Sequence, residues 1–172
     1  MDPDDINLRE AVTAAVNRLH LTSPERRVEL DIDDDLEVVA DYGRLGQVLD
    51  NLLRNADVYS PPHLPIRAEA ARGKRSMVVV RIVDHGPGIP TEQRERVFER
   101  FVRAVDDDSA AGHTGTGLGL AIVRGLVEAH AGRVWLEEPR PGEGTRLAFS
   151  LPAAEAAPDQ GGGAMAAIGP NR

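Results

Sequence analysis

The sequence contains no cysteine and few aromatic residues, and it has no excess of positive charge. The absence of cysteine excludes a disulfide framework and thiolate chemistry, which fits a cytosolic location. The formal net charge of −8 argues against nucleic-acid binding, because no basic surplus can replace the counterions along a phosphate backbone. No apolar run approaches the ~20 residues that span a bilayer, and no signal peptide opens the chain. Any segment that meets a membrane is therefore expected outside this chain.

What is present has the composition of one globular domain. The chain has 172 residues, of which 41% are apolar and 28% are charged, enough to enclose a single core. From Ala153 onward the Ala, Gly and Pro content cannot form a core. We therefore expect a folded domain over residues 1–152 and a disordered tail over residues 153–172.

Hydrophobic periodicity predicts three helices and six strands. The helices are expected over residues 7–20, between the capping Asp41 and Pro61, and over residues 118–130. The strands are expected over residues 28–32, 36–39, 66–71, 77–83, 133–137 and 145–151. In the third helix, the apolar residues expected to face the core are Leu118, Ile122, Leu126 and Ala129. This pattern predicts an α+β fold, a two-layer α/β sandwich in which a mixed, mostly antiparallel sheet of about five strands packs against about three helices.

Four short segments contain the residue types of a ligand site. They are Asn51–Ala56 on the second helix, Asp84–Pro90 after a buried strand, Val97–Phe101 in an irregular region, and Gly115–Leu120 at the start of the third helix. Each segment has an ordinary explanation when taken alone, such as a turn for Asp84 before glycines or the core for the phenylalanines. The glycine cluster is not a dinucleotide fingerprint, because Leu120 stands where a glycine is required, and it is not a P-loop, because no Gly-Lys-Ser/Thr follows.

Together and in this order, the four segments resemble the histidine-kinase branch of the ATPase superfamily that includes gyrase-type, MutL-type and heat-shock chaperone ATPases. They are similar to the N, G1, F and G2 boxes of that branch, and Gly142–Thr145 running into Phe149–Pro152 is similar to its closing strand. The resemblance covers roughly residues 7–152. It implies the ATP-binding catalytic domain of a bacterial sensor histidine kinase, with a flexible ATP lid from about residue 91 to residue 114.

The resemblance also implies a role for individual residues. Asp84 would accept a hydrogen bond from the exocyclic amine of adenine, which favours adenine over guanine because a carboxylate is only an acceptor. Thr145 would support Asp84, and Tyr59 would contact the face of the ring. Asn55 would place its amide oxygen on Mg²⁺, which prefers oxygen ligands and bridges the triphosphate.

The remaining nucleotide contacts implied by the resemblance come from three of the boxes. Backbone groups without a Cβ would approach the ring at Gly86 and Gly88, next to Ile89. Phe98 and Phe101 would be the hinge and clasp of the lid, and Arg103 would reach the γ-phosphate. The N–H groups and the positive end of the third helix would bind the phosphates through Gly115, Thr116, Gly117, Leu118 and Gly119.

Two positions bear on the kind of reaction. Gyrase-like and chaperone relatives have a glutamate where this chain has Asn51, and an amide cannot act as the general base that activates water. The resemblance therefore implies ATP held for transfer rather than for rapid hydrolysis, with Asn51 and Asn55 in the catalytic segment. Many histidine kinases have a lysine where this chain has Val58, and its loss should weaken phosphate binding by about 1–2 kcal/mol unless Arg54 or Arg103 compensates.

The chain lacks a suitable phosphoacceptor, because none of its five histidines precedes an acidic residue on an exposed helix. His130, at the end of the third helix, is expected to be structural. The implied partner is therefore the dimerisation and histidine-phosphoacceptor domain of the same parent kinase, with a response regulator acting after it. We expect this fragment to be a monomer and the cytoplasmic part of a membrane-anchored sensor kinase.

Three other interpretations remain open. An anti-sigma-factor-type serine kinase shares the fold, although the Phe98–Phe101 segment and the long Gly115–Val123 match favour the histidine-kinase pattern. An interaction domain that binds nucleotide poorly is favoured only by Val58. A standalone ATPase is disfavoured by Asn51.

Overall fold

The structure is a computed structural model that describes residues 1–100 and 117–154. Five strands form one sheet: β2 (Val28–Asp31), β4 (Ile66–Arg72), β5 (Met77–Val83), β7 (Arg146–Pro152) and β6 (Val134–Glu137), in that spatial order. Only the β2–β4 pair is parallel, and the other three pairs are antiparallel. This confirms the predicted mixed, mostly antiparallel sheet.

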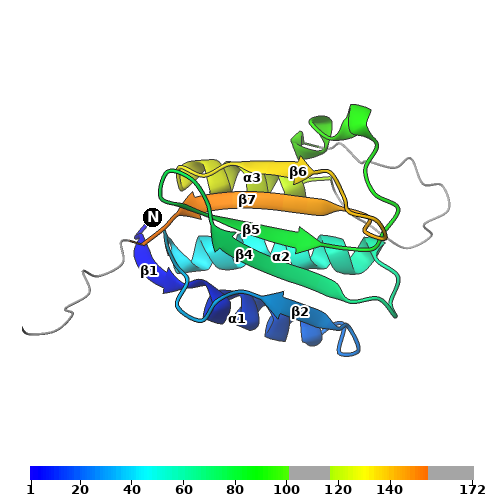
Figure 1. The fold of residues 1–172 in the computed structure, drawn as a ribbon, viewed down its shortest axis with the longest axis horizontal. Helices are drawn as coiled ribbons and strands as arrows, with labels where there is room; N and C mark the ends of the chain where they lie inside the picture. The colour runs from blue at the N-terminus through cyan, green and yellow to red at the C-terminus, as the bar shows by residue number, and fades with distance from the viewer. Residues whose placement is uncertain (101–116, 155–172) are drawn as a thin grey trace, which may run out of the picture.

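Three helices cover one face of this sheet, as Figure 1 shows: α1 (Leu8–His20), α2 (Tyr42–Tyr59) and α3 (Gly119–Ala129). The apolar stripe of α2 is buried, and its core residues are Leu45, Val48, Leu49, Leu52, Leu53 and Ala56. They meet alternate residues of the central strands, among them Val78, Val80 and Phe149, which are fully buried. Burial of each such side chain contributes about 1.5–3 kcal/mol, so this interface holds the two layers together.

The starts of α1 and α2 follow from local sequence. Asn7 caps α1 by accepting a hydrogen bond from the Glu10 amide at 3.0 Å, and Asp41 caps α2 by accepting one from the Arg44 amide at 3.1 Å. Each cap satisfies a backbone donor that the first helical turn leaves unpaired.

A second, two-stranded sheet lies at the end of the molecule that contains the N-terminus (Figure 1). It pairs β1 (Asp4–Asn7), which the sequence analysis did not predict, antiparallel with β3 (Glu37–Ala40). Ala153 continues this edge through a bridge to Val38, and the Ala154 amide donates to the Glu37 carbonyl at 3.1 Å. The described fold therefore extends through Ala154, and the rest of the expected tail lies outside the described residues.

The predicted core face of α3 is wrong for Ile122 and Ala129. The structure buries Val123 and Val127, whereas Ile122 is 38% exposed and Ala129 is exposed. Leu126 is partly buried against the core. Because α3 is apolar on nearly all sides, the spacing of its residues does not single out one face, and packing against α2 and β6 makes the choice.

The irregular region before residue 101 contains two 3₁₀ turns, η1 (Thr91–Gln93) and η2 (Arg96–Phe98). Val97 and Phe98 of the second turn are buried in the core. No helix among residues 1–100 and 117–154 is both long enough and apolar enough to cross a membrane.

His130 links the C-terminal end of α3 to the start of α2. Its Nε2 accepts the Asp41 amide at 3.0 Å, so the ring proton must be on Nδ1, which donates to the Leu126 carbonyl at 2.7 Å. The side chain is buried. The predicted structural role is confirmed.

We expect His130→Ala to lower the free energy of unfolding by about 2 kcal/mol, because the variant leaves the Asp41 amide and the Leu126 carbonyl without their partner. Urea unfolding followed by circular dichroism measures the change. The exposed His63 provides the control, and His63→Ala should stay within about 0.5 kcal/mol of the unchanged chain. Equal effects of the two substitutions would contradict the structural role.

Candidate functional site

Three of the four sequence-predicted segments meet a fourth part of the chain, the hairpin that contains Gly142–Thr145, at the end of the sheet opposite to β1 (Figure 1). These four parts are the C-terminal end of α2, the loop after β5, the start of α3, and the hairpin between β6 and β7. The Asp84 amide donates to the Thr145 carbonyl at 3.0 Å, and the Gly144 amide donates to the Asp84 carbonyl at 2.8 Å. A Cβ on Gly119 would lie 3.2 Å from the amide oxygen of Asn51. Residues far apart in the sequence therefore come together here.

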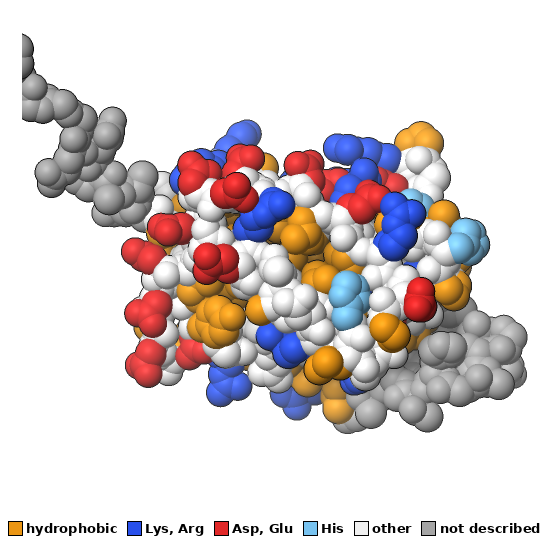
Figure 2. All heavy atoms as spheres, turned by 90° about the horizontal axis from the view of Figure 1, so that it is seen from below, with side chains coloured by type: hydrophobic (Ala, Val, Ile, Leu, Met, Phe, Trp, Pro, Cys, Tyr) orange, Lys and Arg blue, Asp and Glu red, His pale blue; other side chains and the backbone are white. Residues whose placement is uncertain are grey.

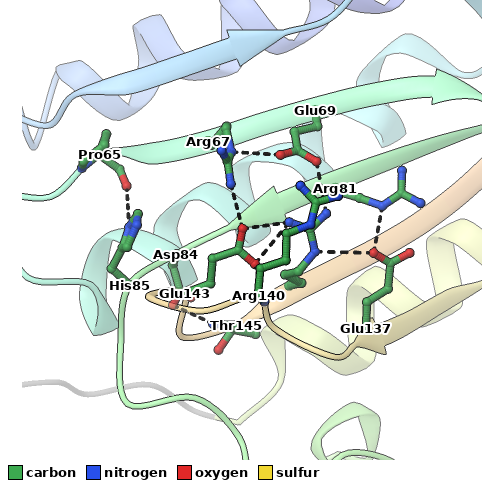
Figure 3. Close-up of polar contacts among 11 residues, drawn as sticks. Pro65, Arg67, Glu69, Arg81, Asp84, His85, Glu137, Arg140, Glu143 and Thr145 are labelled. Carbon is green, nitrogen blue, oxygen red and sulfur yellow. Dashed lines mark hydrogen bonds and ion pairs between the residues drawn. The ribbon is translucent and has the colours of Figure 1, made fainter.

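Asp84 is the buried centre of this arrangement, with 5% of its surface exposed. Its Oδ1 accepts the Gly86 amide at 2.8 Å and the Thr145 amide at 3.2 Å; Figure 3 shows the second contact. The expected support from Thr145 thus comes through its backbone N–H. Oδ2 receives no hydrogen bond from the residues that the structure describes. One oxygen fixes the carboxylate, and the other can accept from a ligand.

Burial raises the pKa of the Asp84 carboxyl group above its usual range, and the amides of Gly86 and Thr145 oppose that rise. A carboxylate removed from water is destabilised unless hydrogen bonds replace its hydration. Here the two backbone amides replace only part of it. The position is therefore energetically costly to the fold, which is typical of residues retained for binding.

Glycine is required where the loop after β5 is in close contact with its neighbours. A Cβ on Gly86 would lie 2.7 Å from the Tyr59 carbonyl oxygen, so this backbone touches the end of α2 directly. Gly88 has φ +78°, a conformation that side chains disfavour. Ile89 follows, partly buried against the core. The glycines of this loop therefore serve close packing of its backbone on the end of α2 and on Gly144.

The asparagines of α2 differ in their surroundings. The Asn51 amide nitrogen donates to the Gln47 carbonyl at 2.9 Å, which turns its amide oxygen toward Gly119. Asn55, one turn later, is half-buried, and its side chain makes no hydrogen bond within the described part of the chain. Tyr59 and Val58 on the last turn are exposed by 46% and 37%. The Asn55 amide and the Tyr59 ring are therefore accessible from solvent.

The start of α3 leaves backbone donors for an anion. Leu118 precedes the helix without a side-chain cap hydrogen bond, and Gly117 before it has φ +69°. The first N–H groups of a helix lack intrahelical partners, so this end can bind a negative group.

Four predicted site residues, Phe101, Arg103, Gly115 and Thr116, lie outside the described residues. Phe98 is described and belongs to the core.

Arg26 contributes to the site although sequence reasoning did not single it out. Its guanidinium is buried, pairs with the Asp57 carboxylate at 2.6 Å, and donates to the carbonyls of Asp57 and Ser60 at 2.9 and 3.1 Å. The Ser60 hydroxyl in turn accepts the His85 amide at 3.2 Å. Arg26 thus holds the end of α2 against the loop after β5. No local pattern indicates this, because Asp57 lies 31 residues away.

The negative charge of the chain is unevenly placed. Figure 2 shows acidic side chains gathered at the end that contains β1, and the exposed acidic residues there are Asp2, Asp4, Asp5, Asp33, Asp34, Asp35 and Glu37. This end lies opposite to the candidate site, and exposed charges are screened beyond about 10 Å at moderate salt. An anionic ligand at the site would therefore be little repelled by them.

Comparisons with known proteins agree on one family. The family described as histidine kinase-, DNA gyrase B- and HSP90-like ATPase matches residues 40–155. Adaptive-response sensory kinase SasA of Synechocystis sp. is 39% identical over 126 residues, which cover 73% of this chain and 32% of that kinase. Sensor histidine kinase WalK of Bacillus subtilis is 39% identical over 122 residues, covering 70% of this chain and 20% of that kinase. This chain thus spans about a third or less of the length of these relatives.

Solved structures give the same result. The mycobacterial sensor histidine kinase MprB superposes with a TM-score of 0.75 at 28% identity, covering 88% of this chain and 98% of that one. Full-length ShkA in complex with AMPPNP superposes with a TM-score of 0.74 at 27% identity, covering 91% of this chain and 32% of that one. The two-layer fold is therefore that of histidine-kinase domains.

We expect Asp84→Asn to raise the free energy of unfolding by about 1 kcal/mol at neutral pH, because an amide in this position is less costly to bury than a carboxylate. Because the pKa of Asp84 is higher in the folded chain than in the unfolded chain, the ionised carboxylate destabilises the fold at pH values above the folded pKa. This destabilisation disappears at pH values below the pKa of the unfolded chain, where the group is protonated in both states. The gain should therefore shrink as the pH falls toward about 4. Urea unfolding of both chains across this range measures it; a variant less stable at every pH would contradict the expectation.

Proposed function

The chain belongs to the histidine kinase-, DNA gyrase B- and HSP90-like ATPase family, as an ATP-binding catalytic domain of the sensor-histidine-kinase type, and from this premise we propose that it binds Mg²⁺–ATP and donates the γ-phosphoryl group to a histidine of a separate phosphoacceptor domain. The observation that carries the proposal is Asp84. It is a buried carboxylate anchored through one oxygen, with no described donor on the other, at the point where the three segments and the hairpin meet.

Adenine recognition follows from the chemistry of Asp84. A carboxylate accepts from the exocyclic amine of adenine, whereas guanine presents a carbonyl at the equivalent place and would be repelled. Gly86 and Gly88 let the loop after β5 pack against the Tyr59 and Gly144 carbonyls, and we place the adenine ring beside this backbone and Ile89. The exposed Tyr59 ring supplies an aromatic surface for the base.

The phosphates and the metal would be held at the neighbouring ends of α2 and α3. Asn55 offers an amide oxygen, the ligand type that Mg²⁺ prefers, and its side chain is not engaged by described residues. Bound Mg²⁺ would neutralise charge on the β- and γ-phosphates. The backbone from Gly117 to Gly119 would donate to the phosphate oxygens. Phe101, Arg103, Gly115 and Thr116 would also contact the nucleotide, and Phe98, which lies in the core, would hold the start of the lid.

Transfer rather than hydrolysis is supported by Asn51. Its amide nitrogen is bound to the Gln47 carbonyl, and neither of its polar atoms can take a proton from water. The acceptor histidine would be supplied by the dimerisation domain of the parent kinase, and a response regulator would receive the phosphoryl group from there. Such a domain would work in the cytoplasm, where ATP is available.

We expect a non-hydrolysable ATP analogue to bind saturably, with higher affinity in the presence of Mg²⁺. Asp84→Asn should lose at least about tenfold in affinity, because its amide would place a donor against the adenine amine. Asn55→Ala should bind the analogue but lose most of the Mg²⁺ effect. Isothermal titration calorimetry measures both quantities.

The matched control for Asp84 is Asp50, which lies on α2 and pairs with Arg18. Asp50→Asn should bind like the unchanged chain. No binding by the unchanged chain at millimolar nucleotide would refute the proposal. It would instead favour an interaction domain whose phosphate site is weakened by the exposed Val58.

The bond formed in the transfer distinguishes the kinase classes. Incubated with labelled ATP and the phosphoacceptor domain of its parent, the chain should produce an acid-labile, alkali-stable phosphohistidine, while hydrolysing ATP slowly by itself. Radiolabel retention after acid and alkali treatment measures this. Acid-stable phosphoserine would support the serine-kinase alternative, and rapid ATP hydrolysis without an acceptor would contradict the role assigned to Asn51.

A further inference from the structure

A cluster of charged side chains lies on the sheet face that the helices leave uncovered (Figure 3). We call it the sheet-face ion cluster; its members are Arg67, Glu69, Arg81, Glu137, Glu143 and Arg146. They come from β4, β5, β6, β7 and the hairpin between β6 and β7. Arg146 is only 3% exposed and pairs with Glu143 at 2.9 Å and Glu69 at 3.1 Å. The cluster, with Arg146 and Glu143 buried at its centre, joins strands that the sequence keeps far apart.

Glu143 is the only member of the cluster that lies in the hairpin turn. Its carboxylate accepts from Arg67 at 2.7 Å, from Arg146 at 2.9 and 3.1 Å, and from the Arg140 amide at 2.9 Å. The turn is closed by the Glu143 amide, which donates to the Arg140 carbonyl at 2.9 Å. The Glu143 side chain attaches this turn to β4 through Arg67 and to β7 through Arg146.

The two residues after Glu143 contact Asp84. The Gly144 amide donates to the Asp84 carbonyl at 2.8 Å, and the Thr145 amide donates to Asp84 Oδ1 at 3.2 Å. A Cβ on Gly144 would overlap the backbone of Gly86, so the turn packs directly on the loop after β5. A shift of the turn would move the donor that orients the Asp84 carboxylate.

We propose that Glu143 is a positioning residue for base recognition: its bonds to Arg67 and Arg146 fix the hairpin so that the Thr145 amide holds Asp84 in the orientation that accepts from adenine. This inference rests on the proposed function for its consequence in binding. Its structural part, the coupling of Glu143 to Asp84, does not depend on any ligand.

The surroundings of the Glu143 carboxyl group favour its ionised, ion-paired form. Burial raises the pKa of Glu143, but the Arg140 amide and the guanidinium of Arg146 together outweigh it and hold the pKa below the usual range. Glu143 thus stays ionised and paired. The removal of one member of a buried pair leaves the other charge uncompensated, so loss of the carboxylate should loosen the turn.

Glu69 provides a matched control within the same cluster. It pairs with the same two arginines, Arg67 at 2.8 Å and Arg146 at 3.1 Å, but it lies in the middle of β4 and has no bond to the turn. Glu69→Gln and Glu143→Gln remove the same charge from the same arginines. Only the second should affect Asp84.

The test compares these two variants with the unchanged chain in amide hydrogen exchange without ligand and in ADP titrations by calorimetry. We expect Glu143→Gln to speed exchange at Gly144 and Thr145 at least about tenfold and to weaken ADP binding by about fivefold to tenfold, with a smaller preference for ADP over GDP. Glu69→Gln should change both quantities less than about twofold. Arg67→Gln, at a partly exposed position, should act like Glu143→Gln but more weakly, and it serves if Glu143→Gln does not fold.

The inference is overturned if Glu143→Gln leaves exchange at Gly144 and Thr145 unchanged, or if Glu69→Gln produces the same changes, since the effect would then belong to general stability. A failure of the unchanged chain to bind ADP would overturn the proposed function instead. The exchange comparison would still show whether Glu143 positions Asp84.

Discussion

The buried carboxylate of Asp84 is the constraint on which the site depends. A carboxylate at this depth has lost most of its hydration, and two backbone amides, from Gly86 and Thr145, replace part of it. These donors come from different loops, so both loops must be packed against each other for the residue to be tolerated. Glycine at positions 88 and 144 makes that packing possible, because a Cβ on Gly144 would overlap the Gly86 backbone and a Cβ on Gly88 would lie 2.9 Å from the Gly144 carbonyl oxygen. The requirement for one hydrogen-bond acceptor thus determines the shape of two loops.

The sheet brings those loops to one end of the molecule. Val83, the last residue of β5, pairs with Arg146, the first residue of β7, so the end of one strand meets the start of the other. The helix layer extends the site, because α2 packs on α3 and sets Asn51 beside Gly119. Arg26 fixes the C-terminal end of α2 by donating to the Asp57 and Ser60 carbonyls. The packing of the sheet and helices therefore determines where the loop after β5, the end of α2 and the start of α3 lie relative to one another.

The arrangement suits a domain that holds its substrate and passes a group to a partner. The residues at the proposed phosphate site are amides and backbone donors, which can bind and orient a ligand without taking a proton from water. A group of exposed acidic side chains lies at the opposite end. The family match and the similarity to sensor kinases are consistent with this division, in which the acceptor histidine is supplied from outside the domain.

Some of these features are determined by the sequence itself because they depend on neighbouring residues. The cap Asp41 accepts from a residue three positions away, and it was predicted correctly. The cap Asn7 and the apolar stripe of α2 depend on local sequence in the same way. The order of the four segments was enough to indicate the fold and the ligand class. Only the tertiary structure decided the buried face of α3, because an apolar helix offers several equivalent faces. It also decided the pairing of β1 and the roles of Arg26 and Glu143. A strand with one buried apolar residue has no clear periodicity, and ion-pair partners 31 and 76 residues away are chosen by the fold and leave no local signal.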